Sequence, residues 1–156
     1  MKRVLITGMS GTGKSTVIQT LASRGYKAID TDWDPAWERQ TNSEWVWRED
    51  RIERLLDTED ADALFVSACV SNQGQFYDRF DHVVLLSAPE AVTVERLAGR
   101  TNNTYGKTPA QVDEVLGYKR TVEPLLRQGA TVEIDTAIPL EDVVSRILSI
   151  TLGSGA

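Results

Sequence analysis

Short apolar runs alternate with longer amphipathic stretches along this chain. The apolar runs are rich in β-branched residues and cover residues 2–7, 26–29, 63–70, 82–87 and 131–134. Most of the stretches between them repeat apolar residues every three or four positions, which is typical of a helix packed on one face. These cover residues 14–24, 89–100, 109–127 and 140–152. Strands that alternate with helices predict an α/β fold of three layers, with a five-stranded parallel sheet covered on both faces.

The rest of the chain divides into an insert, a loop and a tail. Residues 33–59 are polar, look helical and contain all four tryptophans of the chain. Residues 100–109 form a polar loop marked by Gly and Pro, and residues 153–156 form a tail. A chain of 156 residues suits one core, so we expect residues 1–152 to be a single domain.

A phosphate-binding motif follows the first apolar run. Residues 8–15 read Gly-Met-Ser-Gly-Thr-Gly-Lys-Ser, the G-x-x-x-x-G-K-S pattern of a P-loop between a strand and a helix. In this pattern backbone N–H groups surround a nucleotide phosphate, Lys14 reaches the β- and γ-phosphates, and the Ser15 hydroxyl ligates Mg²⁺. The alternative is a Gly-rich turn without a ligand. The predicted nucleotide contacts are Gly8, Ser10, Gly11, Thr12, Gly13, Lys14, Ser15 and Thr16.

Two acidic residues, Asp30 and Asp32, follow the second apolar run. Ligands of an open parallel sheet lie beyond the carboxyl ends of its strands, so both side chains are expected close to the P-loop. One carboxylate can hold Mg²⁺ and the other can take a proton from a substrate hydroxyl. The alternative is that both cap the following helix, since Asp is a favoured N-cap residue.

The P-loop, the Asp-Thr-Asp sequence at 30–32 and the later pair Arg96 and Arg100 resemble the small P-loop kinases, over nearly the whole chain. This group of P-loop ATP-binding proteins includes the nucleoside monophosphate, shikimate and gluconate kinases. The resemblance implies ATP and Mg²⁺ as cofactors. It also implies that Asp30 assists the metal and that Asp32 orients or deprotonates the acceptor hydroxyl.

Further nucleotide contacts are carried over from the same resemblance. Arg96 would stack on adenine, and Arg100 would reach the phosphates from a short lid at residues 100–109. Ile138 lies in the segment 135–139, which resembles the loop that wraps adenine. Arg120 would supply another phosphate-directed cation, with Lys119 as a possible substitute. The alternative for Arg96 and Arg100 is that they lie on an ordinary solvated face of a helix.

In the kinase fold the segment after the second strand binds the substrate. Trp33 is therefore the tryptophan expected to contact the acceptor, although the cluster can equally form a small core of its own. Arg48 and Arg51 both qualify as anchors for a substrate anion, and the sequence leaves the choice open. Gln73 offers an amide for a polyhydroxylated or heterocyclic acceptor.

The third apolar run ends in Ser-Ala-Cys-Val-Ser and lacks the acidic residue that many P-loop enzymes place there. The D-G-[FY]-P-R motif of nucleoside monophosphate kinases is also missing, which favours a hydroxyl acceptor over a phosphate. We therefore predict an ATP-dependent small-molecule kinase in which Lys14, Asp32 and Arg100 are catalytic. The alternative is a nucleotide-binding regulatory protein with little turnover.

Composition and net charge limit the kinds of partner that we expect the protein to bind. The net charge of −6 argues against nucleic acid, since phosphate backbones need a basic face. No apolar stretch approaches the roughly 20 residues that span a bilayer. The single cysteine, Cys69, is expected to pack as a small apolar residue, and the single histidine, His82, to be structural. We expect a cytoplasmic monomer or homodimer that acts on a small molecule.

Overall fold

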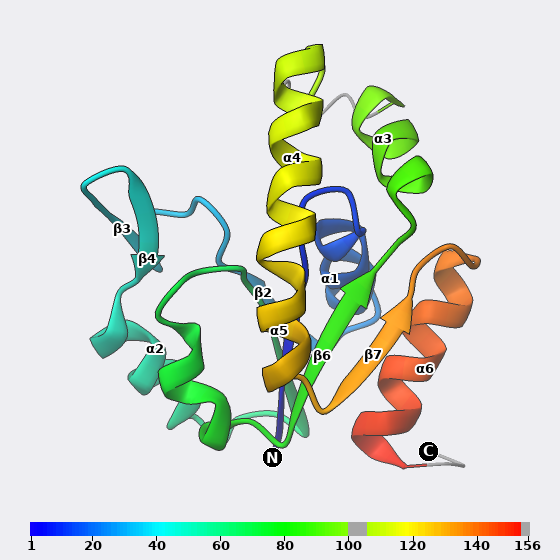
Figure 1. Ribbon diagram of the computed structural model, residues 1–156. Helices are drawn as coiled ribbons and strands as arrows, with labels where there is room; N and C mark the ends of the chain where they lie inside the picture. Colours follow the sequence, from blue (N-terminus) through cyan, green and yellow to red (C-terminus); the bar gives the residue numbers. More distant parts are fainter. Residues whose placement is uncertain (100–105, 154–156) are drawn as a thin grey trace.

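A parallel sheet of five strands forms the centre of the computed structural model, which describes residues 1–99 and 106–153. The strand order is β2-β5-β1-β6-β7, and every neighbouring pair is parallel (Figure 1). The strands are β1 (Lys2–Thr7), β2 (Lys27–Asp30), β5 (Ala63–Ser67), β6 (His82–Ser87) and β7 (Val132–Asp135). Side chains of β5 are buried throughout, as expected of a strand covered on both faces. The predicted five-stranded parallel sheet is confirmed.

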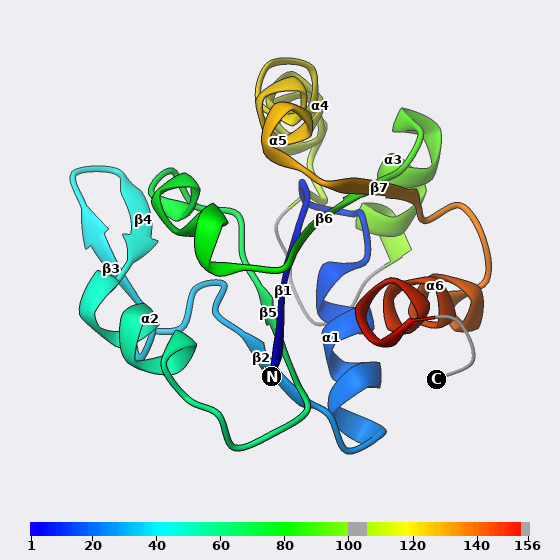
Figure 2. The same cartoon turned by 90° about the horizontal axis from the view of Figure 1, so that it is seen from below.

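Helices cover both faces of this sheet (Figure 2). Helices α1 (Lys14–Ser23) and α6 (Leu140–Leu152) pack on the face that carries Val4 and Ile6. The opposite face carries Leu5 and packs against α2 (Glu49–Leu56) and the short 3-10 helix η1 (Gln73–Arg79). Because successive strand residues point to opposite faces, one strand contributes to both cores.

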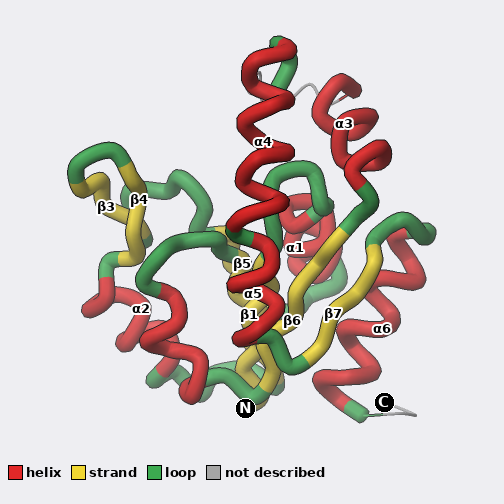
Figure 3. Tube along the Cα trace, viewed as in Figure 1, coloured by secondary structure: helices red, strands yellow, loops and turns green. Residues whose placement is uncertain are grey.

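The insert after β2 differs from the prediction. Residues 33–59 were expected to be helical, but the structure forms an antiparallel hairpin of β3 (Glu38–Thr41) and β4 (Glu44–Trp47) before α2 (Figure 3). The chain turns at Asn42, whose φ of 52° lies in the left-handed region that Asn tolerates. Trp and Val favour strands, so the helical prediction for this part of the insert was wrong.

The long helix predicted from Pro109 toward Arg127 is divided in two. Helix α4 (Pro109–Thr121) begins with a capping box between Thr108 and Gln111, and α5 (Glu123–Gly129) follows after Val122. Pro124 explains the break, because it cannot donate a backbone hydrogen bond and it restricts the residue before it.

Helix α3 (Glu90–Gly99) stands beside α4, as Figure 1 shows. The predicted lid, including Arg100, falls largely on residues 100–105, which lie outside the described residues. Among the residues that are described, no helix is long and apolar enough to cross a lipid bilayer.

Candidate active site

The P-loop connects the end of β1 to the start of α1, as the sequence predicted. Gly13 is the N-cap of α1 with a φ of 93°, and the helix begins without a side-chain cap. Gly11 has a φ of 82°, and a Cβ there would lie 2.9 Å from Cγ2 of Thr93. Backbone N–H groups at an uncapped helix start carry a partial positive charge. The loop therefore fits a nucleotide phosphate.

A network of hydrogen bonds around Thr136 holds the P-loop in place. Sequence reasoning missed this network. The Thr136 hydroxyl lies 2.8 Å from the carbonyl oxygen of Thr12. Arg96 donates from Nη1 to the carbonyl of Gly11 at 3.3 Å and to Oγ1 of Thr136 at 2.7 Å. The Thr12 hydroxyl in turn donates to the carbonyl of Met9 at 2.7 Å. The Arg96 guanidinium thus ties the P-loop to the loop that follows β7.

Lys14 and Asp32 form an ion pair at the centre of the site. The Lys14 ammonium donates to Oδ2 of Asp32 at 2.8 Å, and the two side chains are only 11% and 17% exposed. Burial alone lowers the pKa of Lys14, but the attraction of Asp32 and Asp30 outweighs it, so this pKa lies above its usual value. The lysine is therefore charged at neutral pH and available to a phosphate.

Asp30 lies beside this pair and is held by three donors. Its Oδ2 accepts from the Ser15 hydroxyl at 3.2 Å, and its Oδ1 accepts from the Ser67 hydroxyl at 3.1 Å and from the backbone N–H of Asp32 at 3.0 Å. Asp30 and Ser67 are direct partners in the register of β2 with β5. The Asp30 carboxylate on β2 therefore lies beside the end of β5, the strand that lacks the acidic residue found there in many P-loop enzymes.

The residues around Asp30 fit Mg²⁺. The described residues contain no group of three or more His, Cys, Asp or Glu side chains placed to hold a metal. Mg²⁺ needs no such group, because it keeps several waters and binds through one or two carboxylates together with substrate phosphates. The Ser15 hydroxyl and the Asp30 carboxylate supply oxygen ligands of this kind.

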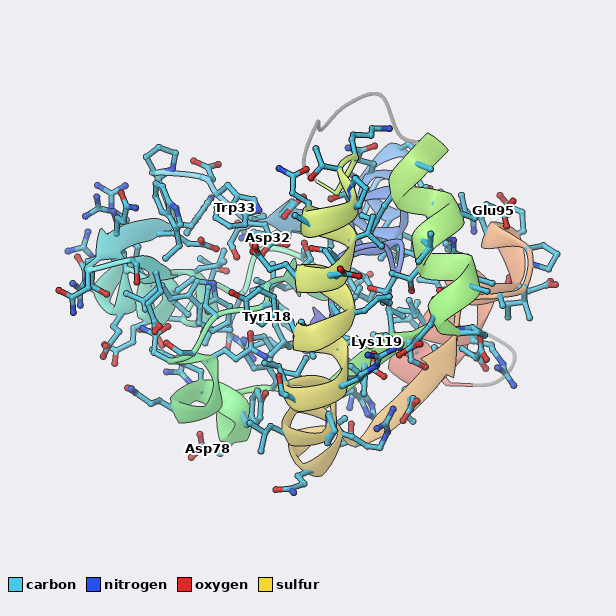
Figure 4. The ribbon with its side chains drawn as sticks, turned by 45° about the horizontal axis from the view of Figure 1, so that its top comes forward. Asp32, Trp33, Asp78, Glu95, Tyr118 and Lys119 are labelled. Carbon is cyan, nitrogen blue, oxygen red and sulfur yellow. The ribbon has the colours of Figure 1, made fainter. Side chains whose placement is uncertain are left out.

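These groups open into one cleft of about 1320 Å³. Most of the predicted site residues line it: Gly8, Ser10, Gly11, Thr12, Gly13, Lys14, Ser15, Thr16, Asp30, Asp32, Trp33, Arg96 and Ile138. The sequence had not singled out Ser43, Glu95, Glu114 and Tyr118, which also line the cleft. Figure 4 labels Tyr118 on α4 and Glu95 on α3. The P-loop thus lies in a space large enough for a nucleotide and a second ligand.

Trp33 extends into solvent at the edge of this cleft. It has a φ of 62° and is 68% exposed. Its ring packs edge to face against that of Trp45, with 6.1 Å between the ring centroids. Trp47 is completely buried and donates from Nε1 to the hydroxyl of Thr31 at 2.9 Å. The tryptophans are therefore divided between two environments: Trp47 belongs to a core, and Trp33 lines the cleft, where its contact with an acceptor stays a prediction.

Glu38 is a buried acid that sequence reasoning missed. It is 1% exposed, and its Oε1 accepts from the backbone N–H of Trp33 at 3.3 Å. Its Oε2 has no hydrogen-bond partner within the part of the chain that the structure describes. Burial, with repulsion from Asp32, raises the pKa of Glu38 to about 7. This carboxyl holds the backbone of Trp33, which has an uncommon conformation for a residue other than glycine.

Two predicted substrate anchors bind the insert itself. Nε of Arg48 donates to the carbonyl of Pro35 at 2.9 Å, and Nη1 of Arg51 donates to the carbonyl of Ala36 at 2.8 Å. Neither lines the cleft in this structure. The sequence left the choice between them open, and the structure turns both toward the backbone of residues 35–36.

Three other predicted site residues, Gln73, Arg120 and Lys119, bind groups outside the cleft. The Gln73 amide is buried and bonds Thr7, Tyr77 and the backbone N–H of Val70, so it lies in the core. Arg120 pairs with Glu90 at 2.8 Å, and its possible substitute Lys119 pairs with Glu123. None of these side chains lines the cleft, because each has a closer partner within the fold.

Cys69 lies in the cleft instead of the core. Its backbone N–H donates to Oδ1 of Asp32 at 3.3 Å, and its side chain is partly exposed. Burial raises the pKa of its thiol, and Lys14 offsets part of this effect. The thiol is therefore mainly protonated at neutral pH, which does not favour a nucleophilic role.

Comparisons with known proteins agree with this geometry. A family model described as an AAA domain matches residues 4–117. No curated protein matches the chain. A shikimate kinase from Acinetobacter baumannii, solved in complex with shikimate, superposes with a TM-score of 0.71 at 19% identity, covering 99% of this chain and 95% of that one.

Two other solved structures have the same arrangement. A gluconokinase from Sinorhizobium meliloti 1021 has a TM-score of 0.60 and 23% identity, over 96% of this chain and 90% of that one. A sugar kinase from Janibacter sp. HTCC2649 has a TM-score of 0.55 and 19% identity, over 96% of this chain and 93% of that one. At these identities the likeness establishes the fold. The chain therefore belongs to the AAA-domain family of P-loop proteins and has the fold of the small P-loop kinases.

Proposed function

We propose that this protein is an ATP-dependent kinase that phosphorylates a hydroxyl group of a small molecule. The observation that carries the proposal is the contact between Lys14 of the P-loop and Asp32 at the end of β2. One group belongs to a phosphate-binding motif, and the other is a carboxylate with the chemistry to accept a proton. The proposal is supported by the contact between these two groups and by their position in one cleft.

The nucleotide half of the site is assigned to the P-loop. Bound ATP supplies the γ-phosphoryl group, and Mg²⁺ bound with it neutralises phosphate charge. Backbone N–H groups from Gly11 to Ser15 would hold the phosphates, with Lys14 on the outer ones. Ser15 and Asp30 are the residues we assign to the metal. Positioning and charge neutralisation account for most of the catalysis in such transfers.

The acceptor half is assigned to Asp32. When Lys14 turns from this carboxylate to a phosphate, Asp32 loses its ion-pair partner and can accept a hydrogen bond from the acceptor hydroxyl. The acceptor oxygen then forms a bond to the γ-phosphorus, the bond from that phosphorus to ADP breaks, and the hydroxyl proton passes to Asp32. Arg100 stays a prediction for the phosphates, since it lies outside the described residues.

The proposal is tested by coupling nucleotide binding to acceptor-dependent turnover. MgADP binding is measured first by calorimetry, and ADP release from MgATP is then followed with and without hydroxylated compounds. We expect binding in the micromolar to millimolar range and a rise in ADP release with one class of acceptor. Absence of MgADP binding by the wild-type protein would contradict the nucleotide assignment itself.

A further inference from the structure

Asp32 lies in a tight turn between β2 and the insert. The backbone N–H of Asp34 donates to the carbonyl of Thr31 at 3.3 Å and closes the turn. Asp32 and Trp33 are its two central residues, and both are labelled in Figure 4. Trp33 has a φ of 62°, and a positive φ at this position of a turn favours Gly or Asn. A bulky residue keeps such a backbone only where its surroundings fix it, so the direction of the Asp32 carboxylate depends on what holds its neighbours.

Trp47 holds the first neighbour, Thr31. The Thr31 hydroxyl donates to the carbonyl of Ser67 on β5 at 2.8 Å and accepts from Nε1 of Trp47 at 2.9 Å. Thr31 and Trp47 are both completely buried. The backbone of Trp47 also exchanges two hydrogen bonds with the side-chain amide of Asn72, at 3.0 and 3.1 Å. The indole therefore connects the start of the turn to a part of the insert that is itself bound to the loop after β5.

Glu38 holds the second neighbour, Trp33. Its Oε1 accepts from the backbone N–H of Trp33 at 3.3 Å, while its Oε2 has no hydrogen-bond partner among the residues that the structure describes. Glu38 is 1% exposed, and burying a carboxyl with one unpaired oxygen is unfavourable. An unpaired buried oxygen and an uncommon backbone conformation thus meet at one contact. Such combinations are typical of functional sites.

Glu38 and Trp47 lie directly opposite each other in the β3–β4 hairpin. One cross-strand pair therefore reaches the residues on both sides of Asp32, because Trp47 binds Thr31 and Glu38 binds Trp33. Neither side chain of the pair lines the cleft in this structure. The pair can act on bound molecules only through the turn.

We propose that Glu38 and Trp47 are positioning residues for Asp32, and that the β3–β4 hairpin orients this carboxylate toward the acceptor hydroxyl. The inference rests on the proposed kinase function, in which Asp32 takes the proton of that hydroxyl. It assigns to the insert a role in the transfer step that is separate from any contact with the acceptor. Loss of either hydrogen bond lets the turn relax and moves the carboxylate.

The only cysteine of the chain reports the position of this carboxylate without any acceptor. The backbone N–H of Cys69 donates to Oδ1 of Asp32 at 3.3 Å, so the amide chemical shift of Cys69 depends on where that oxygen lies. A protein labelled only with ¹⁵N-cysteine gives one amide signal, because the chain contains one cysteine. Asp32→Ala removes the oxygen and defines the full change of the signal. Calorimetry with MgADP is run on every variant as a check of folding.

Glu38→Leu and Trp47→Phe should each move the Cys69 signal by at least half of this full change. Glu38→Gln should move it by less than a quarter, because the amide oxygen can still accept the same hydrogen bond. Glu53→Leu is the matched control, since Glu53 is exposed on α2, and it should leave the signal in place. Thr31→Val removes only the hydroxyl that Trp47 binds. It replaces either of the first two variants if that variant does not fold, with the same expected movement.

Turnover then connects the position of Asp32 to the reaction. ADP release from MgATP is measured with the most active compound among nucleosides, sugar acids, shikimate-like compounds and aminocyclitols. Glu38→Leu should lower kcat about tenfold or more, since a displaced catalytic group loses alignment, and should change the KM for MgATP less than about twofold. Glu38→Gln should keep most of the wild-type kcat.

Three results would overturn this inference and leave the kinase proposal standing, provided that MgADP binds as in the wild type. They are an unmoved Cys69 signal in Glu38→Leu and Trp47→Phe, equal movement in Glu38→Leu and Glu38→Gln, and a wild-type kcat in a variant whose signal has moved. A wild-type protein that binds no MgADP, or that releases ADP equally with every compound, contradicts the kinase proposal instead. The Cys69 signal still decides in that case whether the pair positions Asp32.

Discussion

The ammonium group of Lys14 donates a hydrogen bond of 2.8 Å to Oδ2 of Asp32, although the residues are 18 positions apart and lie on different elements. Lys14 opens α1, and Asp32 follows β2. The pair makes the two halves of the cleft depend on each other, because a phosphate and a carboxylate compete for the same ammonium. This competition underlies the first two predictions.

Asp32→Asn should reduce turnover by a factor of about 100 or more, in the range of a lost general base. The same change removes the partner of Lys14, so the affinity for MgADP should stay the same or increase. Steady-state rates and calorimetry measure the two effects on one sample. Weaker MgADP binding with unchanged turnover would assign Asp32 to the metal instead.

Lys14→Met should weaken MgADP binding at least tenfold and abolish phosphoryl transfer, because the main cation of the phosphate site is lost. The fold should persist, since the P-loop keeps its glycines and its contacts with Thr136. Lys2→Met is the matched control, because Lys2 is exposed at the start of β1. Full activity in Lys14→Met would remove the P-loop from the mechanism.

Arg96→Gln should lower both stability and nucleotide affinity. Arg96 joins the carbonyl of Gly11 to Thr136, and the loss of a partly buried charged hydrogen bond costs about 1–3 kcal/mol of unfolding free energy. Urea denaturation and MgADP titration measure the two effects. Arg54→Gln, on the exposed side of α2, should change neither. Stability and affinity equal to those of this control would show that Arg96 does not hold the loop.

Glu38 should make stability depend on pH. Its pKa in the folded protein is raised to about 7 from an ordinary value of 4.5, so the folded state binds the proton more strongly than the unfolded state. The resulting stability is complete below about pH 4.5 and is lost as pH rises through 7. A shift of this size corresponds to about 3 kcal/mol.

Glu38→Gln should remove this dependence and make the protein more stable than the wild type at pH 8. Urea denaturation at pH 5 and pH 8 gives the comparison. Glu44→Gln, on the neighbouring strand and exposed, is the control. An equal loss of stability between pH 5 and pH 8 in the Glu38→Gln protein would show that another group is responsible.

Local patterns in the sequence predicted the parts of this site that are continuous in the chain. The P-loop follows β1, Asp30 is the last residue of β2 and Asp32 comes two residues later, so the parallel sheet alone brings them to one edge. The contacts of Thr136, Tyr118 and Glu38 depend on packing between distant elements, and the resemblance of segment 135–139 to an adenine loop did not indicate that Thr136 binds the P-loop and Arg96. Their contacts therefore required the structure.

The helical prediction for residues 38–47 and the predicted roles of Arg48 and Arg51 also concern features that a short sequence motif does not determine. A short hairpin at 38–47 carries little periodicity, and its tryptophans fit a helix or a strand until the turn at Asn42 is considered. Arg48 and Arg51 have the right chemistry for a substrate anion. The carbonyls of Pro35 and Ala36 are closer, however, and a sequence motif does not record which way a long side chain turns.

The most direct test of the account is ADP formation from MgATP by the wild-type protein, measured against nucleosides, nucleotides, sugar acids, shikimate-like compounds and aminocyclitols. The account predicts that one class of hydroxylated compound raises the rate at least tenfold above the rate without acceptor. It also predicts that Lys14→Met abolishes this rise. If MgATP binds and no compound raises the rate, the result contradicts the kinase assignment for these acceptor classes and favours the alternative of a nucleotide-binding regulatory protein.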